Sequence, residues 1–159
     1  MFTLLLMKKN RRHEAVRKLL DFIYLTMEFE GTIRTYGTNV DIHGSEIYLM
    51  KNIADHEASH ISELARILGV SKSAVSQMVF RLKKKGLAYK ETDPENRTRY
   101  LVKLTEKGKA AHARHMRLRH EIFTTFLDDL EMFNDDEVEQ FTGFIDRITS
   151  SVKRLQHES

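Results

Sequence analysis

The amino-acid sequence predicts a mainly α-helical fold with a small β-hairpin wing, in which a winged helix-turn-helix core is flanked by N- and C-terminal helices. Three observations predict this fold class. Two short amphipathic segments stand about three residues apart, and two β-prone runs with a turn between them follow at once. Long segments with helical spacing of apolar residues lie on both sides. That order of elements is typical of a winged helix.

The helix-turn-helix is predicted from residues 61–86, which read ISELARILGVSKSAVSQMVFRLKKKG. The first apolar run stops at Gly69, which can take the left-handed conformation that ends a helix. The second run begins after Ser71, whose hydroxyl can cap the next helix. Two short helices joined by about three residues cross steeply. The residues expected to face the core are Ile61, Leu64, Ala65 and Leu68, then Ala74, Val75, Met78, Val79 and Leu82.

The outward positions of the second helix carry small or polar side chains and no carboxylate. These positions are Lys72, Ser73, Ser76, Gln77 and Arg81. Such a face suits the major groove of DNA, where phosphate would repel acidic side chains. An ordinary corner between two helices of a globular core is the alternative interpretation, and the sequence that follows favours the first.

A hairpin is predicted directly after this segment. Residues 87–91 and 97–104 are β-prone, and the turn-rich segment between them holds Pro94, the one proline of the chain. A basic-tipped hairpin behind a helix-turn-helix forms a wing that can reach the minor groove or backbone. Residues 71–103 contain nine Lys/Arg and three Asp/Glu, whereas residues 128–148 contain one Arg and eight Asp/Glu. The net charge of +3 therefore conceals a strongly basic half.

The remaining elements are predicted as helices. The first is expected over about residues 13–36 with Gly37 behind it, and a short one starts at Ser45. Thr105 is expected to cap a long helix that runs to about residue 130. Asn134 and Glu137 form a capping-box pattern before the last helix.

Apolar residues of the last helix are spaced 3-4-3-4-3, the pattern of helices that pack along each other. They are Val138, Phe141, Ile145, Ile148, Val152 and Leu155. This stripe can pack within the chain, against a second copy, or both. Because a winged-helix core is too small to cover the stripes at both ends, we expect an obligate homodimer. The expected dimerisation residues are Leu20, Ile23, Phe141, Ile145, Ile148 and Val152.

No repeat or low-complexity linker divides the sequence, so residues 1–159 are expected to form one domain. In it, helices at about 13–36 and 105–156 would serve dimerisation, and the DNA-binding core would span about 45–104. The chain has no cysteine, which excludes disulfides and thiolate metal sites. No segment reaches the ~18 apolar residues of a membrane span. The apolar residues 1–7 are too few for a signal peptide, so we expect a cytoplasmic protein without membrane contact.

Motifs for catalysis are missing from the sequence: no glycine-rich phosphate loop, cysteine nucleophile or paired carboxylates can be identified. We expect neither enzymatic activity nor a cofactor. Eight histidines raise the alternative of a metal-responsive regulator. The ones considered are His43, His56, His60, His112 and His115. Carboxylates at matching spacing are not evident, so no metal site is expected.

Five aromatic residues raise the question of a small-molecule pocket between the dimer helices and the DNA-binding core. They are Phe22, Tyr24, Phe29, Tyr36 and Tyr48. Large aromatic side chains at helical spacing usually fill the core, and that interpretation is favoured for most of them.

The chain resembles the MarR (multiple antibiotic resistance regulator) family of winged-helix transcription factors. Residues 62–87 and 93–108 carry the resemblance, and LTEKG at 104–108 is its most specific part. Two positions depart from the family pattern. Asn96 and Thr98 replace the usual Asp-x-Arg of the wing tip, with arginines at 97 and 99 instead, and Phe80 stands where an acidic residue is frequent.

The resemblance implies a sequence-specific, DNA-binding transcriptional regulator. Such a protein would be a homodimeric repressor that binds a pseudo-palindromic operator in double-stranded DNA and is relieved by a small-molecule effector. The expected DNA-binding residues are Ser71, Lys72, Ser73, Ser76, Gln77, Arg81, Lys84, Asn96, Arg97 and Arg99. A winged helix that binds proteins and not DNA is the competing hypothesis, but such domains usually present acidic or apolar faces, and this one is basic.

Overall fold

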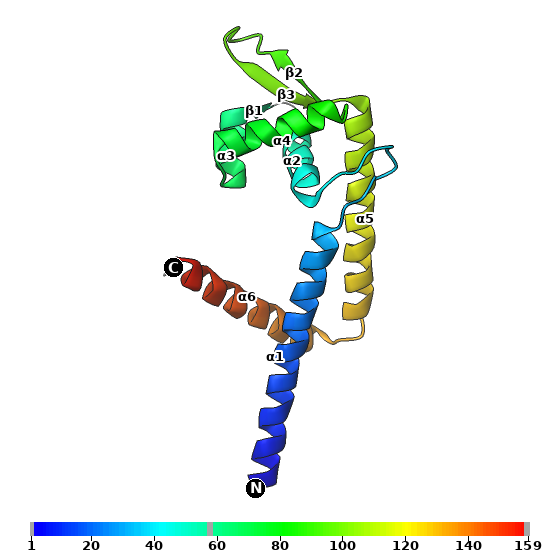
Figure 1. The fold of residues 1–159 in the computed structure, drawn as a ribbon. Coiled ribbons are helices and arrows are strands. Elements are labelled where there is room, and N and C mark those ends of the chain that lie inside the picture. The colour runs from blue at the N-terminus through cyan, green and yellow to red at the C-terminus, as the bar shows by residue number, and fades with distance from the viewer. Residues whose placement is uncertain (1, 57–58, 158–159) are drawn as a thin grey trace. The chain divides into compact units, whose positions relative to one another are not determined.

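The computed structural model describes residues 2–56 and 59–157, in which the predicted fold class is confirmed (Figure 1). The described elements are, in order, α1 (Phe2–Gly31), α2 (Gly44–Asp55), β1 (Ser59–His60), α3 (Ile61–Leu68), α4 (Lys72–Lys84), β2 (Ala88–Thr92), β3 (Tyr100–Leu104), α5 (Glu106–Leu130) and α6 (Asp135–His157). They fall into two compact units that divide between His115 and Met116. None of these helices is both long enough and apolar enough to cross a membrane.

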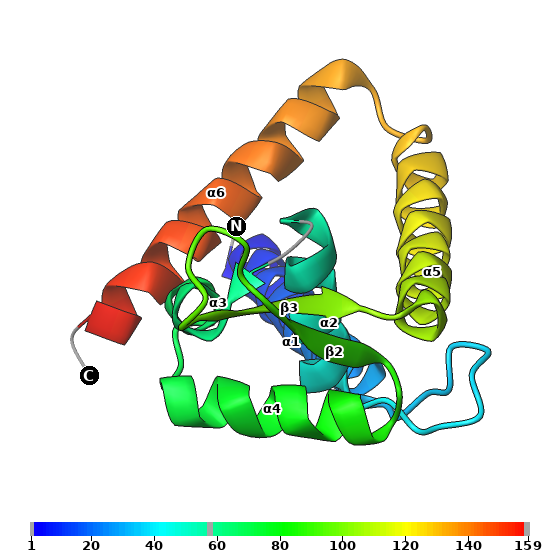
Figure 2. The same cartoon turned by 90° about the horizontal axis from the view of Figure 1, so that it is seen from above.

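The hydrophobic core lies in the first unit, where α2, α3 and α4 pack together and against the sheet (Figure 2). Burial of these side chains is the main term that stabilises the winged helix, at roughly 1.5–3 kcal/mol for each large one. The predicted inward positions of the helix-turn-helix are confirmed as buried or half-buried. The core residues are Ile42, Ile47, Leu49, Met50, Ile53, Leu64, Ala65, Val75, Val79, Leu82, Leu87, Ala88, Val102, Leu104 and Ala111.

Both predicted end signals of the helix-turn-helix are confirmed. Gly69 ends α3 in the left-handed region with φ 65°, a conformation that costs an L side chain energy. Ser71 begins α4, and its Oγ accepts a hydrogen bond from the Ala74 N–H at 3.1 Å. Three residues therefore separate α3 from α4.

The sheet has three antiparallel strands in the order β1-β3-β2. The predicted hairpin is β2 and β3, with Ala88 opposite Leu104 and Thr92 opposite Tyr100. Strand β1 was not predicted, and it pairs His60 with Leu101 on the other edge of β3. A strand of two residues is too short to show an alternating pattern, so only its tertiary pairing identifies it.

Helix α1 differs from the prediction at both ends, because it runs over Phe2–Gly31 and not over about 13–36. Residues 2–12 contain neither glycine nor proline, and nothing in them stops a helix. After Gly31 the chain turns back: Arg34 and Ile42 exchange backbone hydrogen bonds at 3.2 and 3.0 Å. The Arg34 guanidinium also donates to the Phe29 carbonyl at 2.7 Å, which satisfies an end group of α1.

The predicted caps of the two C-terminal helices are confirmed. Thr105 Oγ1 accepts from the Gly108 N–H at 3.0 Å at the start of α5. Before α6, Asn134 and Glu137 each accept from the other's backbone N–H at 3.0 Å, which is a capping box. At Gly108 a Cβ atom would lie 2.0 Å from the Leu87 carbonyl oxygen, so only glycine lets α5 start this close to the wing.

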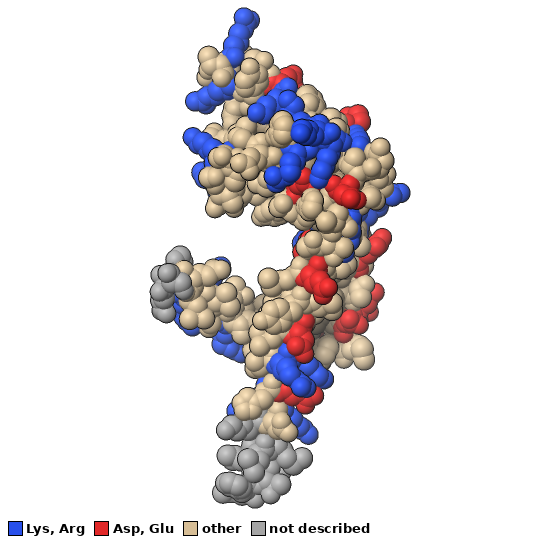
Figure 3. Space-filling model, in the orientation of Figure 1, with Lys and Arg blue, Asp and Glu red and all other residues tan. Residues whose placement is uncertain are grey.

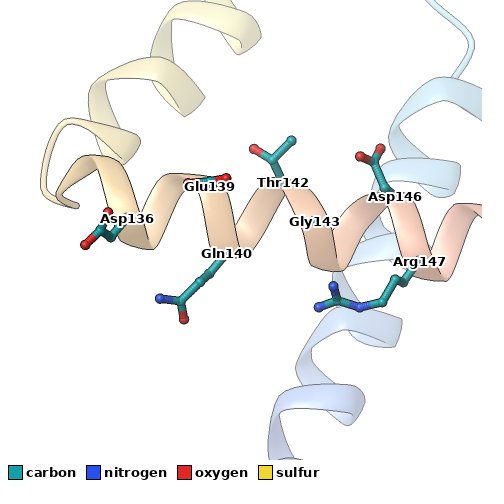
Figure 4. Close-up of a pocket in the computed structure, with 7 residues that line it drawn as sticks. All are labelled: Asp136, Glu139, Gln140, Thr142, Gly143, Asp146 and Arg147. Atoms are coloured by element: carbon teal, nitrogen blue, oxygen red, sulfur yellow. The ribbon is translucent and has the colours of Figure 1, made fainter.

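Helix α6 in the second unit has two opposite faces. Figure 4 shows the polar face, where Asp136, Glu139, Gln140, Thr142, Gly143, Asp146 and Arg147 line a depression on the helix surface. At about 100° per residue the apolar stripe lies on the other side of the helix. Phe141, Val152 and Leu155 of that stripe are 50%, 55% and 63% exposed in the single chain.

Candidate nucleic-acid interface

The outward face of α4 is exposed and basic. Lys72, Ser73, Gln77, Arg81 and Lys84 are exposed on it, whereas Ser76 is half-buried. In Figure 3 the Lys and Arg side chains gather over α4 and the hairpin. Residues 71–86 contain no carboxylate, so nothing along this helix repels phosphate.

A buried glutamate of α2 forms ion pairs with the C-terminal end of α4, on the side that faces the core. The Glu46 side chain is almost fully buried, and its carboxylate lies 2.6 Å from Lys85 Nζ and 3.5 Å from Arg81 Nε. Burial opposes its ionisation, but the His43 N–H hydrogen bond and Lys85 outweigh burial and lower the pKa of Glu46. The carboxylate is therefore ionised near neutral pH and holds the C-terminal half of α4 against α2. Sequence reasoning assigned Arg81 to DNA and missed this contact.

The wing turn is built around Asp93. Its backbone N–H donates to the Arg99 carbonyl at 3.0 Å, and its Oδ1 accepts from the Glu95 N–H at 2.9 Å. Its other carboxylate oxygen lies 3.1 Å from Nε2 of His60, which is on β1. The same imidazole reaches the Tyr100 carbonyl through Nδ1 at 3.2 Å. Through His60, strand β1 thus holds the turn that carries the wing arginines in place.

Besides Arg81, two more predicted DNA-binding residues have side chains that contact other groups of the protein. The Ser71 hydroxyl caps α4. Asn96 is half-buried, and its Oδ1 accepts from both the N–H and the hydroxyl of Thr98, at 3.1 and 2.6 Å. Arg97 and Arg99 at the same turn are exposed. The structure therefore leaves these two arginines available at the wing tip and gives Asn96 a turn-forming position.

The residues expected to form a dimer are on the surface of the single chain. Leu20 and Ile23 on α1 are 48% and 38% exposed, and Ile145 and Ile148 on α6 are half-buried. Among the five aromatic residues, Tyr36 packs on the core and Phe29 is half-buried. Core packing was the wrong expectation for the other three, Phe22, Tyr24 and Tyr48, which are exposed.

The histidines considered as metal ligands are scattered over the described residues. His115 is buried and its ring meets Tyr36 edge-on, with the ring centroids 5.5 Å apart. Burial lowers the pKa of His112 against the opposing attraction of Asp55. Within residues 2–56 and 59–157, no three His, Asp or Glu side chains come close enough to hold a metal ion together. The metal-responsive alternative therefore has no assembled ligand set in this part of the chain.

Four residues that shape the interface were missed by sequence reasoning: Glu46, Lys85, His60 and Asp93. The position of Glu46 in the first turn of α2 looks like ordinary helix-dipole placement, and only the fold brings it under α4. Asp93 had a usable signal, because Asp-Pro frequently starts a turn in which the aspartate accepts backbone hydrogen bonds. His60 gave no signal, since its strand is too short to be recognised.

Residues 40–97 match the model of the MarR family, and this range includes α2, α3, α4 and the first strand of the wing, β2. The HTH-type transcriptional regulator PchR of Bacillus subtilis (strain 168) is 26% identical over 114 residues, which are 70% of this chain and 66% of that protein.

Two solved structures have the same fold. Streptococcus pneumoniae FabT in complex with DNA has a TM-score of 0.72 at 18% identity, over 90% of this chain and 99% of that one. The zinc-responsive MarR family member ZitR of Lactococcus lactis has a TM-score of 0.69 at 19% identity, over 87% and 99%. The winged-helix core of this chain is therefore similar in sequence to the MarR family over residues 40–97, and its fold is similar to that of these two structures.

Proposed function

We propose that this protein binds double-stranded DNA as a homodimer and reads a pseudo-palindromic operator. Each copy places the outward face of α4 in a major groove, with two such grooves about one helical turn apart. The wing carries Arg97 and Arg99 to the adjacent backbone or minor groove. The observation that supports this most directly is the exposed face of α4, which offers hydrogen-bond donors and cations and no carboxylate.

The dimer is supported by the exposed apolar stripes of α1 and α6. Val16, Leu20 and Ile23 are between 38% and 51% exposed, and Phe141 is 50% exposed. A soluble chain rarely leaves such stripes uncovered, and a second copy offers the same stripes by symmetry. The two compact units would then work as one MarR-like domain, in which the stripes hold two winged helices at a fixed separation.

We further propose that the dimer represses transcription in the cytoplasm and that a small-molecule effector relieves the repression. The match of residues 40–97 to the MarR family supports this role, which needs binding and no catalytic step. An effector acts if it favours a dimer whose two α4 helices no longer match the half-site spacing. Streptococcus pneumoniae FabT, which shares this fold, has been solved in complex with DNA, and this supports a DNA-binding role for the winged helix of this chain.

A salt titration of DNA binding tests the proposal. Duplexes selected from a random-sequence pool would be titrated with protein by fluorescence anisotropy at several salt concentrations. We expect the logarithm of the affinity to fall linearly with the logarithm of salt concentration. A winged helix that binds proteins would show no salt-dependent affinity for any duplex, and that result would remove DNA binding from the proposal.

The wing arginines allow a first prediction. Changing Arg97 or Arg99 to alanine should weaken operator binding and lower the salt slope by about one per arginine and half-site, because each cation releases about one counterion. Both side chains are exposed, so the melting temperature should not change. Wild-type binding by both single variants and by the double variant at every salt concentration would mean that the wing does not touch DNA.

Gln77 allows a second prediction about sequence preference. It is exposed on α4 one turn after Ser73, and a glutamine can make two hydrogen bonds to an adenine, worth about 1–3 kcal/mol of discrimination. Gln77→Ala should therefore relax the selected sequence at one position of each half-site and change non-specific affinity little. A uniform loss across all sequences would instead assign Gln77 to the DNA backbone.

A further inference from the structure

Phe80 is an exposed aromatic side chain on the face of α4 that we propose reads DNA. Its side chain is 58% exposed, while Val79 and Leu82 on the same helix are fully buried. At about 100° per residue, Phe80 lies one turn after Gln77 and one turn before Lys84. The ring therefore stands within the row of outward side chains and contributes nothing to the core.

The surroundings of this ring are basic. The Lys84 ammonium lies over it, 4.8 Å from the ring centroid, and Arg81 is the next residue along the helix. An apolar ring among cations favours a partner that offers an apolar group close to negative charges. A protein partner with acidic residues around an apolar residue would meet this description, and so would the major groove of DNA.

The proposed function favours DNA as the partner. In DNA, one apolar group in the major groove is available to the ring. On the base edges of the major groove the C5-methyl group of thymine is the apolar feature, and phenylalanine is among the side chains that contact it. We propose that Phe80 is a specificity-determining residue that contacts a thymine methyl group in each half-site, with Lys84 at a neighbouring phosphate. This inference rests on the proposed DNA binding and names one base that it selects.

Replacing thymidine by deoxyuridine tests the proposed contact, because it removes only the C5-methyl group of the base. The operator selected from the random pool is synthesised with each thymine changed singly to deoxyuridine, which removes the methyl group and keeps the base pair. For wild type we expect one thymine in each half-site whose replacement lowers affinity about fourfold, or about fifteenfold when both half-sites are changed, the effect of exposing one methyl group.

Variants of α4 separate base reading from other roles. Phe80→Ala should bind the thymine duplex and the deoxyuridine duplex with equal affinity. That affinity should lie within about twofold of the affinity of wild type for the deoxyuridine duplex. Lys84→Ala should lower the salt slope but keep the full preference for thymine, because it removes a phosphate contact only. Since Phe80 is exposed, Phe80→Ala should have the same melting temperature as wild type. The comparison of DNA affinities is then independent of folding.

Three outcomes would overturn the inference. The first is wild-type binding that no deoxyuridine replacement weakens. The second is a loss that persists unchanged in Phe80→Ala, which would mean that the methyl group acts through DNA shape. The third is an equal weakening by Phe80→Ala on both duplexes, which would make the ring a support for Lys84. In all three the protein still binds DNA with a salt slope, whereas failure of the proposed function itself appears as no binding to any duplex.

Discussion

Replacing Glu46 by alanine should lower the free energy of unfolding by about 2–3 kcal/mol, which corresponds to a drop of roughly 5–10 °C in melting temperature. The carboxylate is buried between α2 and α4, so its removal leaves Lys85 without the ion pair it makes at 2.6 Å. Lys85 and Arg81 can still turn towards water, which keeps the loss below the upper range for buried ion pairs. Operator affinity should fall as well, because the C-terminal half of α4 loses its tie to α2.

Two further variants isolate the charge of Glu46. Glu46→Gln keeps an acceptor for the His43 N–H but removes the charge, so we expect about half of the loss. Glu91→Ala removes a surface ion pair with Lys103 at 2.6 Å and should cost less than 1 kcal/mol. Equal melting of Glu46→Ala and Glu91→Ala by circular dichroism would contradict a structural role for the buried pair.

The pH dependence of the same pair has a definite sign. The pKa of Glu46 is lowered in the folded protein, so the folded state favours the carboxylate. The stability that it adds is fully present above the ordinary glutamate pKa and is lost as the pH falls through the lowered pKa. The difference in unfolding free energy between wild type and Glu46→Gln should therefore shrink towards zero in acid, which denaturant titrations at several pH values would measure.

Local signals in the sequence account for most of the fold. The predicted helix ends were Gly69, Ser71, Thr105 and the Asn134–Glu137 pair. Each has the expected backbone conformation or capping hydrogen bond, because a cap depends on a few neighbouring residues. The inward positions of α3 and α4 follow from helical periodicity for the same reason. These features need no knowledge of distant contacts.

What the sequence could not predict depends on long-range contacts. Residue 46 and residue 85 meet only because α2 and α4 pack together, and β1 exists only because it pairs with β3. The chain turns back after α1 through the pairing of Arg34 with Ile42, which no local pattern in the sequence predicts. Of the candidate site, the exposed face of α4 was predictable, whereas the position of Asn96 inside the wing turn needed the fold.

Changing Ile145 to aspartate should abolish dimerisation and lower affinity for a full operator by at least about a hundredfold, because both assembly and two-site binding are lost. Ile145 is the third residue of the α6 stripe, and it is half-buried in the single chain. In a dimer that packs along this stripe, an aspartate there would be an unpaired buried carboxylate, which costs several kcal/mol. A monomer binds one half-site and loses the gain in effective concentration that the winged helix of the second copy provides.

Gly143→Asp is the matched control, since it adds the same charge to the polar face of α6 shown in Figure 4, where a side chain at this position meets only the Arg147 side chain at an ordinary contact distance. It should sediment as a dimer and bind the full operator like wild type. Because residue 145 is far along the chain from α4, a loss of binding in Ile145→Asp alone points to assembly and not to the reading face. The monomer should still bind a single half-site duplex with the weak affinity and salt slope of one winged helix. A soluble Ile145→Asp protein that sediments as a dimer and binds normally would refute the proposed dimer contact along α6.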